Sequence, residues 1–138
     1  MKKNEILDFV KTNNLAVIAT ADTNGKPEAA VVEFGELKDL TIIIDLLDTS
    51  RKYKNLKDNK NVAVVIGWDN EITVQMDTLA SELSGDELKI AKNAYFAKNP
   101  RAKKWEDKPG IVYFALKPVW AHYSNVGKSP WVIEEFTW

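Results

Sequence analysis

The dipeptide Asn24-Gly25 is the feature of this sequence that most restricts the fold. It stands between two short apolar runs, Leu15 to Ala21 and Ala29 to Phe34. Asn and Gly readily adopt the positive backbone dihedral angles of a tight hairpin turn, so the two runs are predicted to pair as antiparallel strands. This hairpin favours an antiparallel sheet over the alternating strands and helices of a parallel one.

A run of three isoleucines, residues 42 to 44, lies within the segment Leu40 to Leu47. Continuous β-branched residues predict a strand that is covered on both faces. We expect it to complete a three-stranded meander with the first hairpin, after a turn at Gly35 to Asp39. The remaining strands are predicted at Val62 to Trp68, Glu71 to Leu83, Gly110 to Leu116 and Val119 to Ser124.

Three segments have the patterns of helices. Lys3 to Thr12 places apolar residues at helical spacing. Thr49 to Asp58 begins with two hydroxyl residues that can cap a helix. Ser84 to Lys98 begins with the serine and glutamate of a capping box. Arg101 to Pro109 is predicted as a polar loop, and Asn125 to Trp138 as a tail. The pattern favours a mainly β (α+β) fold, in which six or seven antiparallel strands form a closed sheet with flanking helices.

The composition limits the chemistry. A chain of 138 residues fits one domain, residues 1–138. The absence of cysteine excludes disulfides, thiolate metal sites and a cysteine nucleophile, and it is usual in a reducing compartment. No signal peptide or membrane-length apolar run is visible, so we expect a soluble, cytoplasmic protein that does not contact membranes. A formal net charge of -1 argues against a nucleic-acid partner.

The segment Thr49-Ser50-Arg51-Lys52 is the strongest candidate for ligand binding. Two hydroxyls, two cations and the free N–H groups of a helix start meet here, at the end of a buried strand. Groups of this kind bind phosphate. An ordinary solvated helix start has the same composition, so both interpretations stay open on these residues alone.

His122 is the single histidine of the chain. Without cysteine, one histidine makes a metal site only with the help of carboxylates, and we expect no metal. Regular alternation places His122 on the same face as Trp120, either as a hydrogen-bonded barrel residue or as a general base. Trp131 and Trp138, in the tail, are predicted to contact a second subunit or to stack on a flat ligand.

Five short motifs follow one another between about Leu15 and Ser124. They are Leu15-Ala16-Val17-Ile18-Ala19-Thr20, Asn24-Gly25-Lys26-Pro27, Ser50-Arg51-Lys52-Tyr53-Lys54-Asn55-Leu56, Asn61-Val62-Ala63-Val64 and Lys117-Pro118. In their order and spacing the chain resembles the pyridoxamine phosphate oxidase-related, FMN-binding split-barrel family, including its short general-stress-protein members.

The resemblance implies a six-stranded antiparallel split β-barrel that forms a homodimer, with one FMN in each of two clefts at the subunit interface. In that family the residues that match Ser50, Arg51 and Lys52 hold the FMN phosphate. The strand that matches Ala30 to Glu33 offers backbone groups to the ring, and a polar residue matching Thr73 contacts the flavin, with Gln75 on the same face. The full set of candidate cofactor-binding residues is Ala30, Val31, Val32, Glu33, Thr49, Ser50, Arg51, Lys52, Thr73, Gln75 and Trp120.

Three departures from the family pattern refine the expected function. Ala30 stands where full-length oxidases carry a phosphate-binding arginine, and Thr78 stands where many relatives have glycine. Residues Ser129 to Trp138 contain neither the arginine nor the histidine of the segment that binds the pyridoxal substrate. The resemblance therefore implies an FMN-dependent oxidoreductase with an unidentified small-molecule substrate and unidentified catalytic residues, and not pyridoxamine phosphate oxidase activity itself. The alternatives are a non-catalytic FMN-binding or sensing protein and a relative that binds heme or a deazaflavin.

Overall fold

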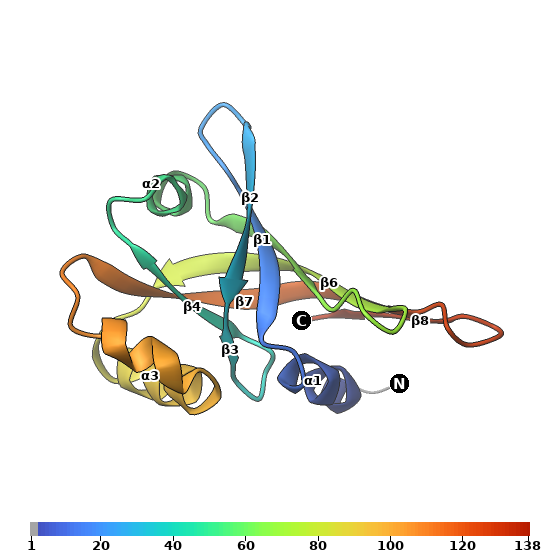
Figure 1. Ribbon diagram of the computed structural model, residues 1–138. Helices are drawn as coiled ribbons and strands as arrows, with labels where there is room; N and C mark the ends of the chain where they lie inside the picture. The colour runs from blue at the N-terminus through green and yellow to red at the C-terminus, as the bar shows by residue number, and fades with distance from the viewer. Residues whose placement is uncertain (1–2) are drawn as a thin grey trace.

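A curled antiparallel sheet organises the computed structural model, which describes residues 3–138 (Figure 1). Neighbouring strands follow the order β2-β1-β5-β6-β7-β4-β3, and β8 pairs with β7. The strands are β1 (Leu15–Ala21), β2 (Pro27–Glu33), β3 (Gly35–Glu36), β4 (Ile42–Leu47), β5 (Asn61–Ile66), β6 (Ile72–Glu82), β7 (Ile111–Asn125) and β8 (Val132–Thr137). The helices are α1 (Lys3–Lys11), α2 (Arg51–Asp58), α3 (Gly85–Lys98) and the 3-10 helix η1 (Pro100–Trp105). The predicted split barrel is confirmed, with short β3 and tail strand β8 in addition to the six strands expected.

The turn at Asn24-Gly25 joins β1 to β2 as predicted. Gly25 has a φ of +80°, and Asp22 Oδ1 accepts the N–H groups of Asn24 and Lys26 at 2.8 and 2.9 Å. The two strands then pair along their whole length, with Ile18 opposite Ala30. Local turn chemistry is therefore sufficient to set this register.

The predicted meander is wrong in its third strand. β4 does not pair with β2, but lies between β7 and β3 at the other end of the sheet. Ile42 and Ile44 face the barrel core, whereas Ile43 packs in a second cluster against α3, and all three are fully buried. Burial on both faces, which the isoleucines predicted, is confirmed; the partner strand depends on contacts distant in sequence.

The C-terminal strands also differ from the prediction. β7 runs through Pro118 without a break, because the register of β6 and β7 shifts there: Asp77 opposes Trp120, whereas Thr78 opposes Pro118. The resulting bulge at Val119 accommodates a proline, which has no N–H to donate to a sheet. The predicted tail contains β8, which pairs with β7 from Trp120 onward.

Two predictions, the capping box at Ser84 and the polar loop at Arg101 to Pro109, need correction. Ser84 precedes α3 but makes no side-chain cap hydrogen bond, and Gly85, with a φ of +62°, turns the chain away from capping-box geometry. The predicted polar loop begins as η1, which buries Ala102. No helix of residues 3–138 combines the length and apolar character needed to cross a membrane.

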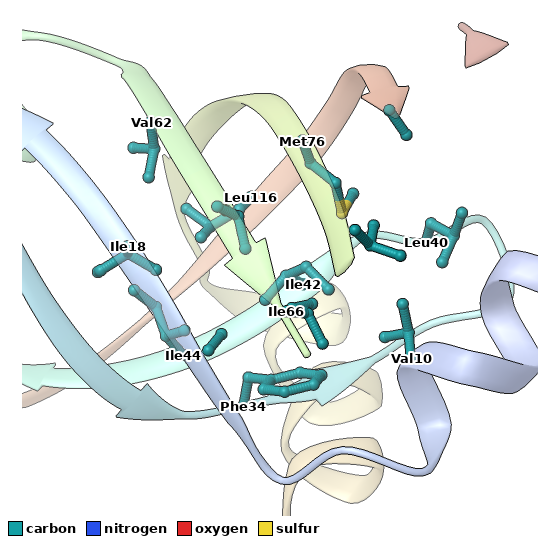
Figure 2. Packing of buried hydrophobic residues seen from close by; sticks show 14 of the residues in the cluster. Val10, Ile18, Phe34, Leu40, Ile42, Ile44, Val62, Ile66, Met76 and Leu116 are labelled. Carbon is teal, nitrogen blue, oxygen red and sulfur yellow. The ribbon is translucent and has the colours of Figure 1, made fainter. Parts of the chain in front are cut away.

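The inner face of the sheet is filled by the hydrophobic core (Figure 2). Ile18, Ile66, Met76 and Leu116 extend into it from different strands, and α1 contributes Val10. Each of these five side chains is at most 1% exposed. Groups that bind a ligand must therefore lie at the sheet edge, at the helix ends or on the outer face.

Candidate functional site

Strand β2 ends the sheet, so one of its sides has no neighbouring strand. An edge strand presents backbone N–H and C=O groups that no sheet partner satisfies. Along Ala30 to Glu33, Val31 and Glu33 are exposed on the outer face, whereas Ala30 and Val32 alternate with them and are half-buried. The edge thus offers the backbone groups that the prediction for these four residues requires.

Helix α2 begins beside this edge with Ser50 as its N-cap. Ser50 Oγ accepts the Tyr53 N–H at 3.2 Å and donates to the Leu47 carbonyl at 2.7 Å. The cap expected from the sequence is confirmed, and it engages the hydroxyl that was predicted to hold phosphate. Thr49, the residue before the cap, is exposed.

Arg51 reaches from the first turn of α2 to a carboxylate of β2. Its Nε lies 3.0 Å from Glu28 Oε2, and Asn55 Nδ2 donates to the same oxygen at 3.2 Å. Asn55 is 4% exposed and donates also to the Thr20 hydroxyl at 3.1 Å. A pocket of about 120 Å³ opens here, lined by Asp22, Lys26, Pro27, Glu28, Arg51 and Asn55. We call the residues that line this pocket the phosphate corner; two of its donors, Arg51 and Asn55, bond to Glu28.

A second polar group involves Lys52 and the Asp45 carboxyl of β4. Burial raises the pKa of Asp45, and Glu33 adds to this rise, while a hydrogen bond from Tyr95 and the charge of Lys52 act against it. Burial, together with the Asp45 charge, raises the pKa of the Tyr95 hydroxyl well above its usual range. Asp45 is therefore more easily protonated than an exposed carboxylate, close to a residue of the β2 edge.

Sequence reasoning missed both Asp45 and its neighbour Tyr113. Burial raises the pKa of Tyr113 to about 12, and its hydroxyl is buried without a hydrogen-bond partner within residues 3–138. The available signal was the position of Asp45 directly after three buried isoleucines, where a lone carboxylate is unusual.

The other predicted cofactor residues lie on the outer face of β6 and β7. Gln75 opposes His122, and Thr73 lies two residues before Gln75 on the same face. The rings of Trp120 and His122 stack with centroids 5.8 Å apart, which confirms that they share a face. These strands are three and four positions from β2 in the sheet, or about 14 to 19 Å at ordinary strand spacing.

The predicted cofactor residues of one chain therefore form two groups. One comprises the β2 edge and the start of α2, and the other the outer face of β6 and β7. A single chain does not bring the two groups together.

The outer face between these groups is hollowed and carries several exposed apolar side chains. A depression of about 510 Å³ is lined by apolar residues such as Ala63 and Val119 and by polar ones such as Asn61 and Asp77. Large apolar side chains stand exposed on the same face: Leu15, Val31, Leu79, Val119 and Ile133. Trp131 and Trp138 of the tail are also exposed, at 65% and 43%. This surface has the character of one that packs against another protein.

Comparisons with solved structures agree with this fold. A general stress protein 26 from Bacillus anthracis is 25% identical, with a TM-score of 0.73, and the match covers 88% of this chain and 92% of that one. A heme binding protein from Mycobacterium smegmatis is 23% identical, with a TM-score of 0.78; the match covers 91% of this chain but 53% of that protein. HutZ, the heme storage protein from Vibrio cholerae, is 15% identical, with a TM-score of 0.65, and 98% and 93% of the two chains are covered.

Comparison of the sequence with models of protein families identifies the family of this chain. No curated protein sequence matches the chain. A family model described as pyridoxamine 5'-phosphate oxidase matches residues 3–125, most of the chain, including both groups of candidate residues. The resemblance predicted from the sequence motifs is thereby confirmed, and the chain belongs to the pyridoxamine 5'-phosphate oxidase family.

Proposed function

We propose that this protein is an FMN-binding flavoprotein of the oxidoreductase class that acts as a homodimer. The observation that supports this most directly is the position of two cations, Arg51 and Lys52, at the start of α2 beside the free edge of β2. In this proposal Arg51 and Lys52 hold the phosphate, and the backbone of residues 30–33 binds the ring. FMN, when bound, supplies electron or hydride transfer.

The Asp45 carboxyl is the group that we expect to hold a proton near the ring. Its raised pKa and its electrostatic contact with Glu33, a residue of the ring-binding edge, support this role. Tyr95, which is 1% exposed, orients the carboxyl through its hydroxyl. A partially buried acid whose pKa is raised can exchange a proton with substrate more readily than an ordinary aspartate.

Titration with FMN tests the proposal. Purified protein is expected to quench flavin fluorescence and to shift the visible spectrum of FMN at micromolar concentration; absence of binding in this range would reject it. Anaerobic reduction of the complex by NADH or NADPH, followed by a screen of electron acceptors, separates an enzyme from a non-catalytic FMN-binding or sensing protein. Sustained turnover of any acceptor excludes the second.

The division of the site into two groups supports the homodimer. A second copy packed on the hollowed outer face would bring its Thr73, Gln75 and Trp120 toward the β2 edge of the first. The same contact would cover the exposed apolar side chains of that face. The cofactor site is then complete only in the dimer.

Ala63→Arg is expected to convert the dimer into a monomer and to weaken FMN binding at least about tenfold, because the long charged side chain would fill the hollow and keep the second copy away from this face, even where it pairs with Asp77 across the strands. Ala63 is exposed in β5 and lines the hollow of the outer face. Analytical ultracentrifugation measures the mass, and flavin titration the affinity. The matched control is Ala97→Arg, at an exposed alanine of α3 outside the sheet. A monomeric wild-type protein would contradict the proposal.

Heme is the second candidate ligand, supported by His122, which is half-buried against Trp120 on the outer face. A half-buried imidazole beside a flat indole offers an axial ligand and a stacking surface. If heme binds there, His122→Ala is expected to abolish the shift of its Soret band. A shift that persists in this variant contradicts ligation by His122, and competition with FMN or a deazaflavin shows whether the ligands share a cleft.

A further inference from the structure

We propose that Glu28 is a specificity-determining residue that weakens the binding of a phosphate dianion at the start of α2. The inference rests on the proposed function, since it concerns the phosphate corner of the same site. It starts from the finding that two side-chain donors there, Arg51 and Asn55, already bond to a carboxylate of the protein.

The contacts hold Glu28 more firmly than Arg51. The Glu28 side chain is 20% exposed, compared with 72% for Arg51. Asn55, buried in α2, donates one hydrogen bond to Glu28 and another to Thr20, which opposes Glu28 in the β1–β2 register. Within residues 3–138, Glu28 is the one bonded partner of the Arg51 side chain. An incoming anion can therefore attract Arg51, but the Glu28 carboxylate stays in the corner.

The charges that line this pocket are balanced without a ligand, and Lys52, the second proposed phosphate ligand, lies outside the lining. The lining contains two cations, Lys26 and Arg51, and two acids, Asp22 and Glu28. Ala30, which lies on the same face of β2 as Glu28, adds no positive charge. A phosphate that binds to Arg51 thus meets a like charge in a partly buried site, where screening by water is reduced.

This arrangement predicts that Glu28 reduces the discrimination between FMN and riboflavin, which lacks the phosphate. Glu28→Gln removes the charge but keeps the side-chain size and an oxygen that can accept from Asn55. We expect FMN to bind about tenfold more tightly to this variant than to the wild type, a change typical of one charged contact. The dissociation constant of riboflavin should change by less than about twofold. Flavin fluorescence titration measures both constants.

Glu82→Gln is the matched control. Glu82 Oε1 accepts from the Tyr53 hydroxyl at 3.0 Å and pairs with Lys57 at 3.5 Å, both on the same helix α2. The substitution Glu82→Gln also removes one negative charge near α2, but Glu82 does not line the pocket that contains Glu28. The ratio of FMN to riboflavin affinity is expected to remain that of the wild type.

Three results would overturn the inference: weaker FMN binding to Glu28→Gln, which would make Glu28 a positioning residue for Arg51; equal changes for FMN and riboflavin; or no change. Inorganic phosphate, followed through the NMR signal of the Arg51 Nε–H, separates this inference from the flavin proposal. Suppose that neither flavin binds. If phosphate then shifts the Arg51 signal more in Glu28→Gln than in the wild type, the role of Glu28 is retained and the FMN proposal is rejected. If phosphate shifts the Arg51 signal in neither protein, the role of Glu28 and the FMN proposal are both rejected.

Discussion

Replacing Lys98 by methionine is expected to lower the free energy of unfolding by about 3 to 5 kcal/mol, the usual result of removing one partner from a buried ion pair. Lys98 Nζ lies 3.0 Å from Glu36 Oε2, and the two side chains are only 11% and 8% exposed. The same ammonium donates to the Val10 carbonyl at 3.2 Å and lies 3.7 Å from the centroid of the Phe34 ring. The substitution leaves the Glu36 carboxylate buried without a counter-charge.

Denaturation with urea measures this loss, and a double variant tests its cause. Burial lowers the pKa of Lys98 and Glu36 opposes that effect, so each charge depends on the other. Lys98→Met combined with Glu36→Leu should regain most of the stability, since an apolar pair of similar volume is tolerated. Lys57→Met, which breaks an exposed pair with Glu82, should cost less than about 1 kcal/mol. An equally small loss for Lys98→Met would contradict the buried pair.

The features that could be predicted from the sequence depend on neighbouring residues. Asn24-Gly25 sets the first hairpin because the turn geometry is local. Ser50 caps α2 because its hydroxyl reaches an N–H three residues later. The three isoleucines of β4 indicated burial on both faces because side-chain alternation is a property of one strand.

The features that could not be predicted depend on residues far apart in the chain. β4 pairs with β7 across about half of the sequence, a choice decided by packing of the whole barrel and not by the isoleucines. Pro118 indicated a strand end, but a bulge against β6 accommodates it. Lys98 and Glu36 are 62 residues apart, and each has the composition of a surface residue until the fold brings them together.

The candidate site shows the same division. The family motif predicted Arg51 and Lys52 because a helix start carries its own donors. It did not predict Glu28, which reaches Arg51 only through the register of the β1–β2 hairpin. The cations at the start of α2 can therefore be predicted from one short segment of sequence. The charge balance of the corner cannot, because it depends on α2 and β2, which meet only in the folded structure.

Lys52→Ala is expected to weaken FMN binding by about 1.5 to 3 kcal/mol, or roughly 10- to 150-fold, through loss of one charge-assisted contact to phosphate. Riboflavin affinity should not change, because that ligand has no phosphate. Both constants come from fluorescence titration of the folded variant. Lys54→Ala, at an exposed lysine of the same helix, is the matched control. An unchanged FMN affinity in Lys52→Ala would show that the phosphate lies elsewhere.

Arg51→Ala is expected to fall in the same range, but its effect should depend on Glu28. In the wild type, the Glu28 carboxylate and the phosphate compete for the Arg51 guanidinium. In Glu28→Gln the competing carboxylate is absent, so the guanidinium is more available to the phosphate. The loss caused by Arg51→Ala should therefore be larger in the Glu28→Gln background, and two residues in contact commonly show such coupling. FMN titration of the wild type, both single variants and the double variant measures it. Equal losses in the two backgrounds would mean that Glu28 and the phosphate do not compete for Arg51.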